Sequence, residues 1–363
     1  MENWVIRKYM EGDEEKIINL VNIAFNVEID KKYWNWKYKE NPTKLIKIWV
    51  VENRRELIGH MSFIPMIMKI EGKTQIGALQ SSDAVHPKYQ GQGIYTKLCK
   101  QVHPEIKEIT AINFDCPSER GYPFAIKFGY FKVCSLPRLF KPLDLERILQ
   151  RHLRNVYLIK IISAFFTLFL KIFYATNKFN YTSIKGINIR KKGINIRKIS
   201  SFDDRFNDFW KKVSKNYKIV VVKDKEYLTW RYIDKPGNNY TVYSAEEEDE
   251  ILGYIVLESV KTEYLKGGRI MDILTLTGRE DVIQSLILKA IAHFKEENAD
   301  IIHCCISKNN IYYDILKKNG FIPLFFVKKP RLVARANTTE ISKSFLINPK
   351  NWFITSGDLM IYE

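Results

Sequence analysis

Residues 86–98, HPKYQGQGIYTKL, have the residue types and the spacing that point most directly to chemistry. His86-Pro87 is a turn signal, Gly91 and Gly93 stand one residue apart, and an amphipathic run follows them. A glycine-rich turn between a strand and a helix exposes backbone N–H groups at the helix N-terminus, where they suit a pyrophosphate. The stretch therefore reads either as a phosphate-binding loop or as a plain strand-to-helix turn.

Two common nucleotide-binding patterns fail on spacing. The Walker pattern requires Gly-x4-Gly-Lys-Ser/Thr, which residues 86–98 do not contain. The dinucleotide fingerprint requires Gly-x-Gly-x-x-Gly, and the third glycine position is Thr96. Neither pattern explains the loop.

The elements around this loop predict a mixed α/β fold. EEKIINLVNIAF has the helical spacing Ile17, Leu20, Val21, Ala24, and IYTKLCKQVHPEIKE carries a second helix. IKIWVVEN, ELIGHMSFIPMIMKI, TQIGALQSSDAV and ITAINFDCP read as strands. The loop thus joins a strand that ends before His86 to the second helix.

The second half of the chain repeats the first. KKYWNWKYKENP (31–42) matches KEYLTWRYIDKP (225–236), with Trp36 answering Trp230, and ELIGHMSF matches EILGYIVL. A repeat at this separation indicates a duplicated domain. Where the second copy should carry the loop, MDILTLTGREDVIQSLI has only Gly278, followed by two acids. Those acids would repel a phosphate, so we expect the second copy to be silent.

The loop resembles motif A of the GNAT acyl-CoA N-acyltransferases, Arg/Gln-x-x-Gly-x-Gly/Ala. Gln90 and Gly93 match in order and context, whereas the sixth position, small in the family, is Tyr95. The resemblance implies an α/β fold of two GNAT-like domains in tandem. The expected parts are a GNAT acetyltransferase domain (1–135), a basic, partly amphipathic helical connector (136–200), a degenerate GNAT-like domain (201–330) and a C-terminal tail packed on the domains (331–363).

The resemblance also implies acetyl-CoA as the acyl donor and assigns residues to it. Backbone groups of Ala84 and Val85 would hydrogen-bond the pantetheine arm, and Asn113 would line the other side of the cleft. The pyrophosphate would lie on the backbone N–H groups of the loop, which comprises Gln90, Gly91, Gln92, Gly93, Ile94 and Tyr95.

Direct attack of an amine on a thioester needs a base for the ammonium proton and an acid for the leaving thiolate. The family often uses a tyrosine four residues before the helix-terminal glycine, but here that position is Ala125. Tyr122 is the nearest tyrosine and the candidate acid, and Asp83 is the candidate base. Equally, Tyr122 could have a structural role, and Asp83 could fix the turn at the strand end.

The leading hypothesis is an acetyl-CoA-dependent N-acetyltransferase whose acceptor is an aminosugar or another small amine. One alternative is an aminoacyl-tRNA-dependent peptidoglycan-type aminoacyltransferase, with the basic segment 136–200 on the RNA. Another is a non-catalytic acyl-CoA-binding module. The leading hypothesis disfavours a nucleic-acid partner, and the sequence does not fix the oligomeric state.

Five cysteines without a CxxC pair or a nearby His cluster predict no metal site and indicate reduced thiols in the cytoplasm. The N-terminus has no apolar run typical of a signal peptide.

The net charge of +17 is concentrated in residues 136–200, which hold fourteen Lys or Arg and two acids. This segment includes the run NVYLIKIISAFFTLFLKIFY, whose longest apolar stretch is too short to span a membrane. One interpretation is a helix buried between the domains. The other is that residues 140–175 lie on an anionic membrane, at its inner face. The tandem heptapeptide KGINIRK (185–198) reads as a strand or hairpin.

Overall fold

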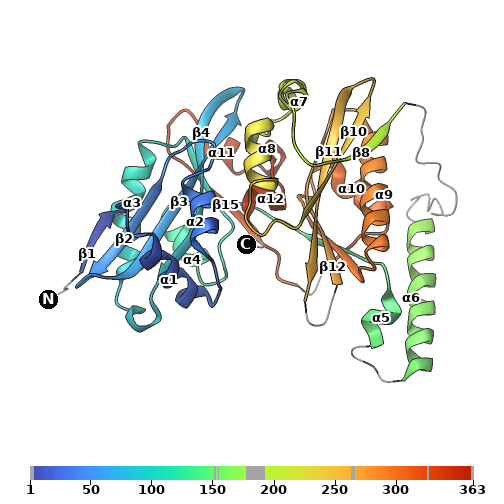
Figure 1. Ribbon diagram of the computed structural model, residues 1–363, viewed down its shortest axis with the longest axis horizontal. Helices are drawn as coiled ribbons and strands as arrows, with labels where there is room; N and C mark the ends of the chain where they lie inside the picture. The colour runs from blue at the N-terminus through green and yellow to red at the C-terminus, as the bar shows by residue number, and fades with distance from the viewer. Residues whose placement is uncertain are drawn as a thin grey trace. The chain divides into compact units, whose positions relative to one another are not determined.

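The computed structural model describes residues 4–150, 153, 155–176, 193–262, 266–324 and 327–360. The chain forms two compact units, and many of their helices and strands are labelled in Figure 1. Unit 1 contains Met1–Cys134, Tyr217–Asn238 and Pro330–Trp352; unit 2 contains Ser135–Asn216, Asn239–Lys329 and Phe353–Glu363. Each unit is therefore assembled from three separate pieces of chain.

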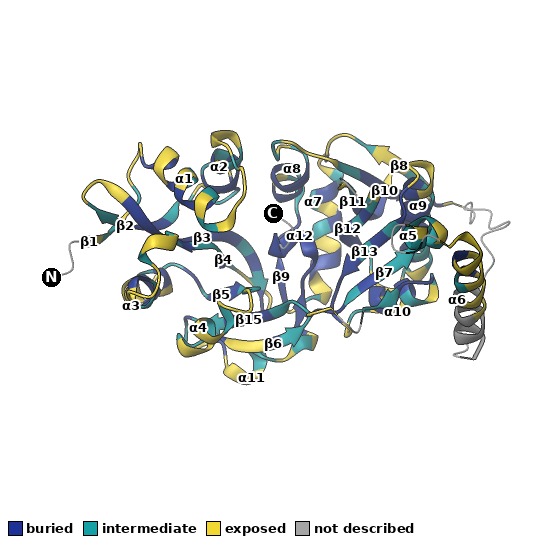
Figure 2. Ribbon diagram, turned by 90° about the horizontal axis from the view of Figure 1, so that it is seen from below, coloured by how far each residue is buried: buried dark blue, intermediate teal, exposed yellow. Residues whose placement is uncertain are grey.

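Unit 1 is a mixed sheet with helices on both faces. Its main strand order is β1-β2-β3-β4-β5-β15-β6, and β9 pairs with β3. In Figure 2, α1 and α2 cover one face of this sheet, and α3 and α4 cover the other. The strands are β1 (Trp4–Lys8), β2 (Lys47–Asn53), β3 (Glu56–Ile70), β4 (Lys73–Val85), β5 (Ile112–Asp115), β6 (Phe131–Ser135), β9 (Ile219–Val221) and β15 (Arg331–Ala336). The helices are α1 (Glu14–Phe25), α2 (Lys31–Tyr38), α3 (Ile94–Lys107), α4 (Tyr122–Lys127), α8 (Lys225–Tyr232) and α11 (Lys343–Leu346).

Unit 2 has its own mixed sheet, in the order β14-β7-β13-β12-β11-β10-β8. Its strands are β7 (Arg138–Pro142), β8 (Asn195–Ile199), β10 (Tyr240–Glu247), β11 (Glu250–Lys261), β12 (Lys266–Thr275), β13 (Ile301–Cys305) and β14 (Ile322–Pro323). Its helices are α5 (Leu145–Gln150), α6 (Val156–Thr176), α7 (Arg205–Val213), α9 (Glu280–Glu296), α10 (Ile311–Lys318) and α12 (Ser356–Leu359). The short strand β16 (Trp352–Phe353) pairs with β9.

The two sheets have the same order of strands when β8 is matched to β1, β10 to β2 and so on. The strand inserted before the last one is β15 in unit 1 and β7 in unit 2. Each sheet thus takes this strand from the other half of the sequence. The structure differs from two of the expected parts. Segment 136–200, expected to be a helical connector, also contributes the strands β7 and β8 to the unit 2 sheet. Segment 331–363, expected to be a packed tail, begins with β15, which is a strand of the unit 1 sheet.

The second heptapeptide copy provides β8, which pairs with β10. The first copy, residues 185–191, lies outside the described residues.

The sequence repeat is visible in α2 and α8, which both belong to unit 1. Each helix has an aspartate cap, since Asp30 accepts from the Tyr33 N–H at 2.8 Å and Asp224 from the Tyr227 N–H at 2.9 Å. The matching tryptophans meet: Trp36 Nε1 donates to the Trp230 carbonyl at 2.6 Å, and Trp230 Nε1 donates back to the Trp36 carbonyl at 2.8 Å. The repeated tryptophans therefore form a reciprocal pair in the core of unit 1.

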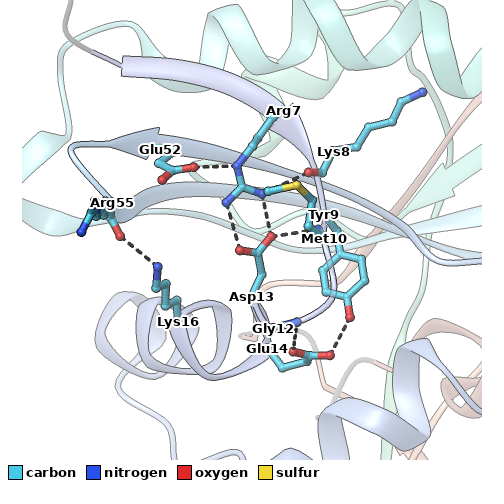
Figure 3. A network of polar contacts seen from close by, with 10 residues as sticks. All are labelled: Arg7, Lys8, Tyr9, Met10, Gly12, Asp13, Glu14, Lys16, Glu52 and Arg55. Carbon is cyan, nitrogen blue, oxygen red and sulfur yellow. Dashed lines mark hydrogen bonds and ion pairs between the residues drawn. The ribbon is translucent and has the colours of Figure 1, made fainter.

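The first turn of α1 is fixed to the sheet by ion pairs, shown in Figure 3. The Arg7 guanidinium donates to the Asp13 carboxylate at 2.6 and 2.9 Å and to Glu52 at 2.6 Å. One turn further, Lys16 Nζ donates to the Arg55 carbonyl at 3.2 Å. These contacts hold α1 against the turn between β2 and β3.

Candidate active site

The strands β4 and β5 diverge at the centre of the unit 1 sheet. They pair in parallel only from Gly77↔Ile112 to Leu79↔Phe114. Beyond that point β4 continues to Val85 and pairs with β3 alone among the described strands. Residues 80–85 therefore present an edge toward β5 that no described strand occupies, and a ligand can hydrogen-bond to such an edge.

A β-bulge interrupts β4 within this open edge. Ser82 has a φ of +59°, and the pairing with β3 shifts register between His60 and Ser62. His60 Nδ1 lies 2.8 Å from the Ser82 carbonyl, and Lys37 Nζ donates to Ser82 Oγ at 3.0 Å. Burial lowers the pKa of His60 to about 4, so the ring is neutral near pH 7. The bulge is thus held by specific side chains, and it redirects the next residues of β4.

The hydrogen-bond pattern decides which backbone groups face the opening. The His86 N–H donates to the Ile58 carbonyl at 2.9 Å. Because alternate residues of an antiparallel pair bond to the partner, the N–H and C=O of Val85 point toward β5, whereas those of Ala84 point toward β3. The N–H of Val85 therefore has the orientation expected for binding pantetheine, whereas its carbonyl accepts from Gln90 Nε2 at 3.2 Å. Ala84 is adjacent, with its backbone groups directed to β3.

The predicted phosphate loop follows directly. Gly91 and Gly93 have φ values of +82° and +78°, the left-handed region that favours glycine. Gly93 is the N-cap of α3, and its carbonyl accepts the Lys97 N–H at 3.1 Å. Gln90, Gly91, Gln92 and Gly93 are all exposed. The loop thus presents backbone N–H groups at the start of a 14-residue helix, the arrangement that binds anions.

α3 is anchored beneath the loop by one apolar face. Ile94, Leu98, Val102 and Ile106 are at most 1 % exposed and belong to a core cluster with Trp49. Their spacing of four residues places them on one side of the helix. The position of the loop is therefore set by core packing.

Tyr95, the irregular residue of the motif, points from α3 into the unit. Its hydroxyl donates to Asp83 Oδ2 at 2.9 Å, and its ring contacts Phe124 at 5.3 Å between centroids. Gln80 Nε2 also donates to Asp83 Oδ2, at 2.5 Å, and the Tyr130 hydroxyl donates to Gln80 Oε1 at 2.6 Å. The large side chain therefore leaves the loop and joins a polar network around Asp83.

Two carboxyl groups stand at the ends of the diverging strands. Burial raises the pKa of Asp83 to about 7, although hydrogen bonds from Gln80, Tyr95 and the Ser62 N–H favour its ionised form. Asp115, the last residue of β5, has a pKa raised well above its usual value by burial and by the charge of Asp83. Asp83 is thus poised to exchange a proton near neutral pH, while burial and the charge of Asp83 favour the neutral form of Asp115.

Sequence reasoning missed Asp115, Gln80 and Tyr130. The available signal for Asp115 was its position: INFD ends in an aspartate at the close of the strand beside β4. Gln80 and Tyr130 gave no such signal, because their roles depend on contacts between distant residues.

Two predicted site residues lie in other surroundings. Tyr122 begins α4 and is half-buried, with the Arg331 guanidinium 4.0 Å from the centre of its ring. Asn113 is fully buried in the paired part of β5, where its Oδ1 accepts from the Thr110 hydroxyl at 2.8 Å. The contacts described for these two side chains do not join them to the network around Asp83.

A hollow of about 390 Å³ lies beside His86, on the α1 side of unit 1. Lys16, Arg54 and Arg55 line it together with Glu56, so cationic side chains outnumber the acidic one. A hollow with this lining suits an anionic group.

The corresponding edge in unit 2 is closed. Thr275 pairs with Gly253 as Val85 pairs with Gly59, so the two residues are equivalent. The Thr275 N–H donates to the buried Tyr312 hydroxyl at 2.8 Å. The protein's own side chain thus satisfies in unit 2 the strand N–H that corresponds to the Val85 N–H of unit 1.

The helix start of unit 2 is also unsuited to a phosphate. Arg279 is the N-cap of α9, and its guanidinium pairs with Asp281 at 3.1 Å and with Glu247 at 3.2 Å. The first turn carries Glu280 and Asp281. These carboxylates already satisfy the positive end of the helix.

Comparison with known proteins agrees with this geometry. Residues 5–133 match the family described as the acetyltransferase (GNAT) domain. No curated protein matches the chain.

Solved structures share the fold over most of the chain. A GCN5-related N-acetyltransferase from Anabaena variabilis has 14 % identity and a TM-score of 0.62, covering 92 % of this chain and 73 % of that one. One from Kribbella flavida has 11 % identity and a TM-score of 0.59, covering 92 % and 71 %. The Saccharomyces cerevisiae N-myristoyltransferase with bound myristoyl-CoA has 15 % identity and a TM-score of 0.58, covering 93 % and 83 %.

Residues 5–133 therefore match a GNAT domain, and the solved structures share the fold over most of the chain. The predicted fold class, mixed α/β with two GNAT-like units, is confirmed.

Proposed function

We propose that the protein is an acetyl-CoA-dependent N-acetyltransferase that works in the cytoplasm. One observation carries this proposal: the open edge of β4 ends directly in the Gly91–Gly93 loop at the start of α3, with Asp83 at the same edge. All five cysteines lie within the described residues as free thiols, as in a reducing compartment.

In the proposed reaction, a small amine such as an aminosugar attacks the thioester carbon. The pyrophosphate of acetyl-CoA binds the N–H groups of the loop from Gln90 to Tyr95, and the pantetheine arm bonds the backbone of Val85. Asp83 accepts the ammonium proton as the C–N bond forms. The C–S bond then breaks, and Tyr122 is the proposed proton donor to the thiolate. Holding both reactants at one edge supplies much of the rate.

The second unit is proposed to bind no donor. Tyr312 fills its strand edge, and acidic residues occupy the helix start. Titration with acetyl-CoA is therefore expected to give one site per chain. A stoichiometry of two would show that both copies bind.

Acetyl-CoA is expected to raise the melting temperature of the purified protein. Ligand at 100 times its Kd adds about 2.7 kcal/mol to the free energy of unfolding. Thermal shift with acetyl-CoA and longer acyl-CoAs, followed by detection of free CoA thiol with a panel of amines, measures binding and transfer separately. Absence of stabilisation by every acyl-CoA would exclude the proposal and leave the aminoacyl-tRNA alternative. Stabilisation without thiol release would favour the non-catalytic module.

The Tyr95→Phe variant is expected to shift the pH dependence of kcat/KM. The hydrogen bond that this variant loses favours ionised Asp83, so the pKa of Asp83 should rise. Because the base must be deprotonated, the acid limb of the profile should move to higher pH, by up to about one unit. Tyr122→Phe is the control, because it also removes one tyrosine hydroxyl. It should lower kcat without moving the acid limb. An unchanged limb in Tyr95→Phe would show that Tyr95 does not act on the base.

A further inference from the structure

The helix α6 exposes a concentration of large apolar side chains. Among the described residues of this helix, Tyr157 is 83 % exposed, Phe165 68 %, and Ile161 and Leu168 52 % each. Figure 2 shows the beginning of α6 largely in the colour of exposed residues. Apolar residues exposed singly need no explanation, but a contiguous group of this kind marks a contact surface.

The exposed side chains share one face of the helix. Tyr157, Ile161, Phe165 and Leu168 follow the spacing i, i+4, i+8, i+11, which places them in a single stripe. Ile159 and Ser163 lie on the opposite side and are buried. α6 packs beside α5 within unit 2.

The helix therefore packs with one face and presents the other to its surroundings. The four side chains of the stripe are thus not covered by the described residues of unit 2.

The segment of sequence that contains this stripe is rich in cations, although Glu146 lies on the neighbouring helix α5. From residue 147 to residue 202 the sequence holds twelve Lys or Arg and no Asp or Glu. Lys160, one position before Ile161, is exposed on α6 itself. An apolar stripe beside an exposed lysine, in a segment of such basic composition, fits the boundary between the headgroups and the acyl chains of an anionic bilayer. It fits a second copy of this chain poorly, because two such basic segments would repel each other.

We propose that α6 is an interfacial helix that binds the surface of an anionic phospholipid bilayer. Tyr157, Ile161, Phe165 and Leu168 enter the headgroup boundary, and Lys160 contacts the lipid phosphates. The helix lies in the plane of the surface; within the described residues, none is long and apolar enough to cross a bilayer. Docking would bring the acyltransferase to acceptors at the membrane.

Vesicle flotation of the full-length chain tests the proposal. Vesicles of phosphatidylcholine alone are compared with an equal mixture of phosphatidylcholine and phosphatidylglycerol. Wild-type protein is expected to bind the anionic vesicles at least about tenfold more strongly, and added salt should weaken this binding. Ile161→Asp, which places a carboxylate in the stripe, should reduce binding about tenfold or more.

Ile311→Asp is the matched control. Ile311 is also exposed, at 45 %, and begins α10 in the same unit. The substitution changes the net charge equally, so the control should bind like the wild type, with circular dichroism checking the fold of both variants.

Equal binding by both variants, or no binding by the wild type, would overturn the proposal. So would a wild-type dimer that Ile161→Asp dissociates in the absence of vesicle binding, since the stripe would then join two copies. None of these readouts uses acetyl transfer, so they stand apart from the proposed reaction.

Discussion

Replacing Gly93 with aspartate is expected to weaken acetyl-CoA binding by about 100-fold or more, because the new carboxylate would stand beside the pyrophosphate at the N-terminus of α3. A Cβ at Gly93 meets no atom within 4 Å, so the side chain itself fits. Its φ of +78° adds a backbone cost of roughly 1 kcal/mol for any non-glycine residue. Isothermal titration with acetyl-CoA measures the loss of affinity.

Gly72→Asp separates the two effects. Gly72 lies in the turn between β3 and β4, has a φ of +81°, and likewise has open space at its Cβ position. It therefore has the same backbone strain and gains the same charge, but it is not part of the loop. The control should lose a similar amount of thermal stability and keep its affinity. If both variants bind acetyl-CoA normally, the loop is not the pyrophosphate site.

The loop could be predicted from sequence because its determinants are local. Turn residues before it, two glycines with positive φ and the apolar spacing of α3 all lie within residues 86–106. The closed edge of unit 2 was predictable only in part. The missing glycines predicted a silent copy, whereas the bond from the Thr275 N–H to Tyr312 depends on a contact across 37 residues.

The exchange of β7 and β15 could not be predicted. RLFKP and RLVARA are both short strands of mixed polarity, and each fits beside a central strand of a similar sheet. Because the two halves share one strand order, the local pattern is satisfied in either sheet. Only the three-dimensional path of the chain decides which sheet each strand joins.

The site network escaped prediction for the same reason. Asp83 was recognisable as a strand-end carboxylate, but its environment is made by Gln80, Tyr95 and, one step further, Tyr130. Tyr95 violates the motif locally and is explained only by its contact with Asp83. A departure from the family pattern at this position thus coincides with the candidate base.

Asp83→Asn is expected to lower kcat/KM by about 100-fold or more, the usual contribution of a general base. The amide keeps an oxygen that can accept from Tyr95 and Gln80, and only the longer 3.3 Å contact from the Ser62 N–H is lost. The wild-type rate should fall as the pH drops through about 7, where Asp83 becomes protonated. The variant should lack this limb. Stopped assays of CoA release from pH 5 to about 9 measure both effects.

The Asp83→Asn substitution should lower the rate but raise the free energy of unfolding. The folded pKa of Asp83, about 7, lies above its usual 3.8, so this group favours the folded state fully below pH 3.8 and loses that contribution as the pH rises through 7. The amide of the Asp83→Asn variant carries no charge to bury, so this variant should be more stable than the wild type at pH 8, on the order of 1 kcal/mol. Urea unfolding at pH 5 and pH 8 measures the difference, which should be larger at pH 8.

Asp115→Asn distinguishes the two carboxyl groups. Burial and the neighbouring charge of Asp83 raise the pKa of Asp115 and favour its protonated form, which an amide resembles in charge and shape. Its rate should stay within about tenfold of the wild type, and the acid limb should remain. If Asp115→Asn removes the limb and Asp83→Asn keeps it, the base is Asp115. If Asp83→Asn loses rate and gains stability while Asp115→Asn does neither, the carboxylate of Asp83 destabilises the fold but serves the reaction. Unit 1 would then keep a destabilising group at the open edge of β4 for its function.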